Sequence, residues 1–114
     1  MDTRANLEPL LPTLARYLNK VRELYPVEAV YLFGSYATGQ PREESDIDLA
    51  IVSPGFSGSR LKDGGKLSAL TWSIDTRIEP WGFRPEDFTE DHVLPSIILR
   101  HGIRIDQFLA ERES

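Results

Sequence analysis

Two acidic residues, Asp46 and Asp48, are the residues of this sequence best suited to chemistry. They open an apolar run, Ile47 to Val52, that predicts a β-strand. Because side chains alternate across a strand, both carboxylates are expected on one face while Ile47 points to the core. Two carboxylates so close repel each other, and a divalent cation is the usual remedy. Mg²⁺ binds carboxylate oxygens together with substrate phosphate oxygens, so the pair predicts a metal-assisted site for a phosphate-bearing substrate.

A glycine–serine pair precedes the carboxylates and offers a candidate phosphate-binding turn. Gly34 follows the apolar run 27–33, which predicts a central strand covered on both faces. Glycine adopts backbone angles closed to other residues, and a helix beginning at Ser35 would direct free N–H groups outward as an anion site. For this turn and the carboxylates to share one substrate, the two strands must be antiparallel neighbours.

Each of these residues also has a purely structural explanation. Asp46 suits a turn, Asp48 suits a solvent-facing strand position, and Ser35 suits the N-cap of a short helix. Two acids on one face of a strand nevertheless cost stability unless something offsets their repulsion, which favours the chemical interpretation.

The pattern Gly34-Ser35, ten residues, Asp46-Ile47-Asp48 resembles the signature of polymerase-β-like nucleotidyltransferases. For so short a chain, the minimal nucleotidyltransferase (MNT) group is the nearest resemblance. It implies an α/β (α+β) fold with a mixed β-sheet of three to four strands flanked by helices. It also implies transfer of a nucleoside monophosphate from an NTP, with pyrophosphate released, two Mg²⁺ ions held by Asp46 and Asp48, and a triphosphate bound at Gly34 and Ser35.

The resemblance further implies a third catalytic, metal-binding carboxylate on a neighbouring strand. The strand expected over 74–81 offers Glu79, our preferred candidate, with Asp75 as the alternative. Relatives often carry an arginine where this chain has Thr38, which leaves Arg42 as the nearest basic residue for a phosphate contact.

The same resemblance suggests a partner. MNT proteins are commonly antitoxins paired with a HEPN ribonuclease toxin, which they neutralise by binding it and by adenylylating a tyrosine. We therefore expect ATP as the nucleotide, a hydroxyl of a HEPN toxin as the acceptor, and no further acceptor-binding domain. Two alternatives stay open: an antitoxin or partner subunit that acts by binding alone, and a small-molecule nucleotidyltransferase.

Length, charge and composition narrow the class of protein. We expect residues 1–114 to form a single domain. The sequence has no cysteine, which excludes disulfides and thiolate metal sites. It opens without an apolar signal-peptide core and has no apolar run of membrane-spanning length, so we expect a cytoplasmic protein. A formal net charge of −5 argues against a long nucleic acid as partner.

The remaining patterns predict the elements that must position these residues. Apolar residues at helical spacing predict a helix over 7–25, with its regular part starting between Pro9 and Pro12 and its end set by Pro26. The other expected elements are a loop over 53–65, a helix over 66–73, a strand over 74–81, a helical turn at Pro85, a helix over 93–101 stopped by Gly102, and an edge strand over 103–105.

The predicted loop has two interpretations. It is either a slack surface loop or a lid that brings Arg60, Lys62 or Lys66 to the phosphates. Trp72 is expected in the core or an interface rather than under a nucleotide base.

Overall fold

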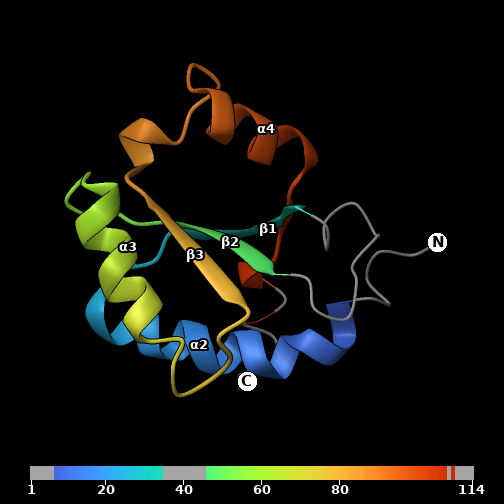
Figure 1. The fold of residues 1–114 in the computed structure, drawn as a ribbon. Coiled ribbons are helices and arrows are strands. Elements are labelled where there is room, and N and C mark those ends of the chain that lie inside the picture. Colours follow the sequence, from blue (N-terminus) through green and yellow to red (C-terminus); the bar gives the residue numbers. More distant parts are fainter. Residues whose placement is uncertain (1–6, 35–45, 108, 110–114) are drawn as a thin grey trace.

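The computed structural model of the protein describes residues 7–34, 46–107 and 109 (Figure 1). In chain order the elements are η1 (Glu8–Leu10), α2 (Leu11–Leu24), β1 (Ala29–Phe33), β2 (Ile47–Val52), α3 (Arg60–Ala69), β3 (Ile78–Phe83), η3 (Pro85–Asp87), α4 (Val93–His101) and β4 (Ile103–Arg104). Figure 1 shows α2 and α4 on opposite sides of the sheet, with α3 beside β3. The predicted fold class, a mixed sheet flanked by helices, is confirmed.

The sheet has the strand order β3-β2-β1-β4. β1 runs antiparallel to both β2 and β4, whereas β2 and β3 are parallel. The predictions that β1 is central and that β1 and β2 are antiparallel neighbours are therefore confirmed. In this register Phe33 lies opposite Asp48, and Asp48 lies opposite Glu79.

One face of the sheet carries the larger part of the core. Apolar side chains of β1 and β2, among them Leu32 and Leu49, pack in one cluster with Leu14 and Leu18 of α2. The buried hydroxyl of Tyr17 donates a hydrogen bond of 2.8 Å to the backbone oxygen of Leu67, which ties α2 to α3.

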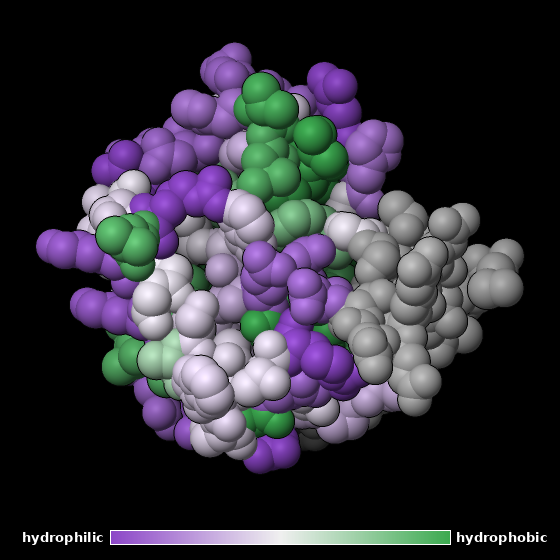
Figure 2. Space-filling view, viewed as in Figure 1, coloured by the Kyte–Doolittle hydropathy of each residue, from purple (hydrophilic) through white to green (hydrophobic). Residues whose placement is uncertain are grey.

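The opposite face has a smaller cluster under α4. Ile98 of α4 packs there with Ala50 and Phe83, and the partly buried rings of β1 and β3 surround them. The outer side of α4 stays apolar, since Val93 is 79% and Ile97 48% exposed. Figure 2 shows this hydrophobic surface gathered over α4. α4 thus packs over Ala50 and Phe83 on the face that also carries Asp48 and Glu79.

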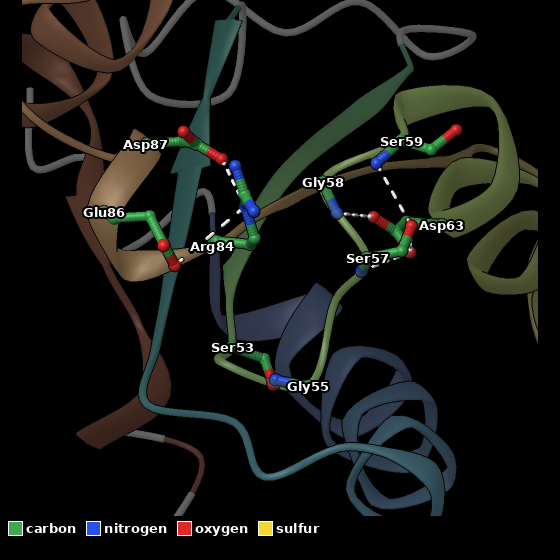
Figure 3. Close-up of polar contacts among 9 residues, drawn as sticks. All are labelled: Ser53, Gly55, Ser57, Gly58, Ser59, Asp63, Arg84, Glu86 and Asp87. Atoms are coloured by element: carbon green, nitrogen blue, oxygen red, sulfur yellow. Dashed lines mark hydrogen bonds and ion pairs between the residues drawn. The ribbon is translucent and has the colours of Figure 1, made fainter.

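The segment between β2 and β3 differs from its prediction. A loop over 53–65 and a helix over 66–73 were expected, but α3 occupies Arg60–Ala69 and includes two glycines. Its start is fixed by hydrogen bonds rather than by propensity. Ser59 caps the helix by accepting a bond from the Lys62 amide, and buried Asp63 accepts bonds of 3.0–3.2 Å from the hydroxyl and amide of Ser57 and the amide of Gly58 (Figure 3).

Other element ends follow the sequence more closely. α2 begins after Leu10 and ends at Leu24, ahead of Pro26, and α4 has the predicted bounds with Gly102 as its C-cap. β3 begins at Ile78, so the prediction that it starts at residue 74 is wrong, because residues 71–77 form turns instead. Trp72 was expected in the core or an interface; it is 79% exposed, so the core alternative is wrong and the interface alternative stays a prediction. No helix in the described part of the chain has the length and apolar character needed to cross a membrane.

Candidate active site

Asp48 and Glu79 stand side by side on neighbouring strands. They are register partners in the parallel pair of β2 and β3, and Asp46 lies exposed immediately before β2. Neighbouring strands lie about 4.8 Å apart, so the two side chains project from adjacent positions on one face. The structure thus brings Glu79, from the next strand along the chain, beside Asp48 of the predicted carboxylate pair.

Partial burial and the neighbouring negative charges raise the pKa of Asp48. The pKa of Asp48 rises from its ordinary value of 3.8 to about 6, first because the carboxyl is partly buried. The charge of Glu79 and a hydrogen bond with its side chain raise the pKa further, and the charge of Asp46 adds to the effect. A carboxyl held between protonated and ionised forms near neutral pH is typical of a functional site.

Gly34 follows β1 and lies against the same carboxylate. Its φ of 75° is in the left-handed region that glycine favours. A Cβ at this position would collide with Oδ2 of Asp48 and lie 3.3 Å from its Cγ. The turn after β1 and the carboxylate of β2 are therefore in contact, as a shared substrate requires. Two other predicted site residues, Ser35 and Arg42, lie outside the described residues.

Asp75, the alternative third carboxylate, is engaged elsewhere. It lies in the turn before β3, where it accepts hydrogen bonds from the Arg77 amide and guanidinium, the shortest being 2.8 Å to Nη2. These bonds lower the pKa of Asp75. A carboxylate committed to an arginine is poorly placed to bind a metal, so the geometry favours Glu79.

Arg60 and Trp81 lie at the same site, although no sequence pattern groups them. Trp81 shares the face of Glu79 because it is two residues further along β3. The Arg60 guanidinium carbon lies 4.2 Å from the centroid of the Trp81 ring, and the ring of Phe33 meets the indole edge-on at 6.2 Å. Arg60 also lines two hollows, one of about 380 Å³ toward α4 and one of about 230 Å³ that includes Glu79. The alternation of side chains along β3 could have indicated Trp81, but Arg60 depends on where α3 begins.

The donor set suits a hard cation that shares its coordination with a substrate. Among residues 7–34, 46–107 and 109, no three acidic, histidine or cysteine side chains are grouped to hold an ion by themselves. The adjacent pair of Asp48 and Glu79 nevertheless fits Mg²⁺, which usually takes one or two carboxylates and completes its shell with water and phosphate oxygens. The arrangement can therefore bind a metal–phosphate complex better than a bare metal ion.

Comparisons with known proteins agree with this geometry. Residues 14–105 match the family model of the nucleotidyltransferase domain. The chain is 33% identical over 94 residues to a Haemophilus influenzae protein named "Probable protein adenylyltransferase MntA", an alignment covering 79% of this chain and 81% of that protein.

Two solved structures share the fold. A Sulfolobus solfataricus protein assigned as a nucleotidyltransferase superposes with a TM-score of 0.63 at 19% identity, over 90% of this chain and 85% of that chain. A chain from a toxin–antitoxin structure with AMP-PNP superposes with a TM-score of 0.53 at 20% identity, over 86% of this chain and 82% of that chain.

Proposed function

Because this chain belongs to the nucleotidyltransferase domain family, we propose that it is a Mg²⁺-dependent enzyme that transfers AMP from ATP to a hydroxyl of a partner protein. The observation that carries the proposal is the in-register pair of Asp48 and Glu79, with Gly34 in contact with Asp48. Asp46, Asp48 and Glu79 are the catalytic, metal-binding carboxylates. When bound, the metal lowers the pKa of the attacking hydroxyl and neutralises charge on the triphosphate.

Other residues of the chain bind the triphosphate and take up the proton of the acceptor hydroxyl. Gly34 and Ser35 hold the β- and γ-phosphates with backbone and hydroxyl donors, and Arg42 adds a positive charge there. Glu79 is exposed and accepts the hydroxyl proton. The acceptor oxygen then forms a bond to the α-phosphorus, the bond from that phosphorus to the β-phosphate bridging oxygen breaks, and pyrophosphate leaves.

The partner is proposed from the comparisons. The Haemophilus relative is named as a protein adenylyltransferase, and one structural neighbour comes from a toxin–antitoxin structure with an ATP analogue. We propose a HEPN-type toxin as the partner and one of its tyrosines as the acceptor. The reaction needs ATP and Mg²⁺, both supplied by the cytoplasm.

The test is to incubate the purified protein with ATP, Mg²⁺ and the product of the neighbouring reading frame, and then to analyse that product by mass spectrometry. The proposal predicts a mass increase of one or more AMP groups on a tyrosine, lost when Mg²⁺ is chelated and lost in Asp48→Asn. Asp75→Asn is the matched control, because it removes an acid that is bound to Arg77, and it should keep the modification. An unmodified partner in the presence of bound Mg²⁺-ATP would contradict the proposal.

A further inference from the structure

A groove between α3 and β3 opens beside the carboxylate of Glu79. Arg60, Gly64 and Ser68 line its helix side, at intervals of four residues, and Glu79 to Gly82 line its strand side. Its volume is about 230 Å³. A Cβ built at Gly64 would meet nothing within 4 Å, so this glycine leaves open space in the groove wall rather than filling it.

The groove carries one basic and one acidic side chain, Arg60 and Glu79. Arg60 makes no ion pair with a described residue, and its guanidinium is stacked on the Trp81 ring with its N–H groups free for a ligand. The indole nitrogen of Trp81 is buried and has no hydrogen-bond partner among the described residues. The Trp81 ring therefore serves the groove as a platform for Arg60 and not as a hydrogen-bond donor. The free guanidinium of Arg60 suits a ligand group that carries hydrogen-bond acceptors and negative charge.

The direction of the reaction identifies which substrate lies there, and this step rests on the proposed function. In an in-line displacement the attacking and leaving oxygens lie on opposite sides of the phosphorus. The proposed triphosphate turn at Gly34 is on the β1 side of Asp48, and Glu79 is on the β3 side. Pyrophosphate therefore leaves toward β1, and the acceptor hydroxyl approaches from β3, where the groove lies.

We infer that this groove binds the acceptor segment of the partner protein, and that Arg60 and Trp81 select a hydroxyl flanked by carboxylate side chains. The carboxylate pairs with the Arg60 guanidinium, which the Trp81 ring holds in place by stacking. Small-molecule sites usually enclose about 300–1,000 Å³, so a groove of about 230 Å³ suits one side chain of a larger partner.

The loop before α3 keeps Arg60 in this position. Asp63 binds Ser57 and Gly58, and a Cβ on Gly58 would lie 2.8 Å from Cζ of Arg84. The Arg84 guanidinium in turn donates a hydrogen bond of 2.7 Å to Asp87. Figure 3 shows this pair beside the loop. The loop before α3 is thus held by Asp63 and packed against Arg84, and Arg60 is the first residue of the helix that follows it.

Two blocked pentapeptides test the inference, one with a tyrosine between two aspartates and one with a tyrosine between two asparagines. Binding is followed without nucleotide by the indole ¹⁵N–¹H NMR signals of the two tryptophans, with exposed Trp72 as the internal reference. We expect the acidic peptide to shift the Trp81 signal with an affinity about fivefold or more above that of the amide peptide, as for a partly screened charge-assisted hydrogen bond. Arg60→Gln should abolish this preference. Lys66→Gln, which removes the same charge from the part of α3 outside the groove, should keep it.

A transfer assay with the same peptides and ATP labelled on the α-phosphate supplies the second readout. Arg60→Gln should raise the KM for the acidic peptide about fivefold, while kcat and the affinity for Mg²⁺-ATP stay unchanged, because the residue contacts only the acceptor. Equal affinity of wild type for both peptides, or a shift of the Trp72 signal instead of the Trp81 signal, would overturn the inference. Peptide binding at Trp81 by a protein that transfers no AMP would refute the proposed function and leave the groove assignment supported.

Discussion

Replacing Asp48 with asparagine should stabilise the protein at alkaline pH. The rise of its pKa from 3.8 to about 6 corresponds to about 3 kcal/mol in favour of the protonated form in the folded state. Because the side chain is only partly buried, solvent screening reduces this to about 1 kcal/mol. Asparagine has nearly the same shape and carries no charge, so it avoids the repulsion from Glu79 at every pH.

The sign of the pH dependence follows from the direction of the shift. A carboxyl whose folded-state pKa is raised contributes stability below its ordinary pKa, and this contribution is lost as the pH rises through about 6. Wild type should therefore lose about 1 kcal/mol between pH 4 and pH 8 that Asp48→Asn does not lose.

Urea denaturation in EDTA at pH 4.5 and pH 8 measures the difference. Asp48→Asn should exceed wild type by about 1 kcal/mol at pH 8 and by clearly less at pH 4.5. Asp75→Asn is the matched control with the opposite sign, because Arg77 lowers the pKa of Asp75 and the variant loses that pairing at pH 8. If Asp48→Asn were less stable than wild type at pH 8, the Asp48 carboxylate would stabilise the fold through another partner. Repulsion between Asp48 and Glu79 would then not be the dominant effect.

Four further outcomes follow from the same geometry. Gly34→Ala should lower the unfolding free energy by at least about 1–2 kcal/mol, since it strains a positive φ and collides with Asp48, and chemical denaturation would report the loss. Asp63→Ala should cost about 1–3 kcal/mol by leaving the donors before α3 unpaired, whereas an unchanged denaturation midpoint would mean that water replaces the carboxylate. Mg²⁺-ATP should raise the melting temperature far more than either component alone, by about 2.7 kcal/mol of stabilisation at a hundredfold excess over Kd, and a flat thermal-shift titration would contradict the nucleotide site. Glu79→Gln should retain this shift and lower AMP transfer by at least ~100-fold, and a fully active variant in a labelled-ATP assay would move the third carboxylate elsewhere.

Much of the fold and the carboxylate pair could be predicted because the relevant signals are local. Alternation along 46–52 places Asp46 and Asp48 on one face, and the apolar run before Gly34 predicts β1. Prolines and Gly102 mark the helix ends. Once the turn at Gly34 and the carboxylates share a substrate, the antiparallel pairing of β1 with β2 follows.

The segment after β2 could not be predicted in the same way. Hydrogen bonds among its loop residues decide where α3 begins, and no periodic pattern of apolar residues marks that point. Gly64 and Gly65 argue against a helix, yet α3 forms there because Ser59 caps its first turn, Asp63 binds the loop amides before it, and Leu67 is buried. The position of Arg60 over Trp81 depends on the same capping bonds. A sequence pattern describes neither the capping bonds nor the register that sets Glu79 beside Asp48.

The most direct test of the central claim is to compare ATP labelled on the α-phosphate with ATP labelled on the γ-phosphate in otherwise identical reactions with the partner protein and Mg²⁺. A nucleotidyl transfer at Asp48 and Glu79 predicts that only the α-label becomes covalently attached, that pyrophosphate appears in equal amount, and that Asp48→Asn abolishes both. Attachment of the γ-label, or α-label transfer that persists in Asp48→Asn, would contradict the claim.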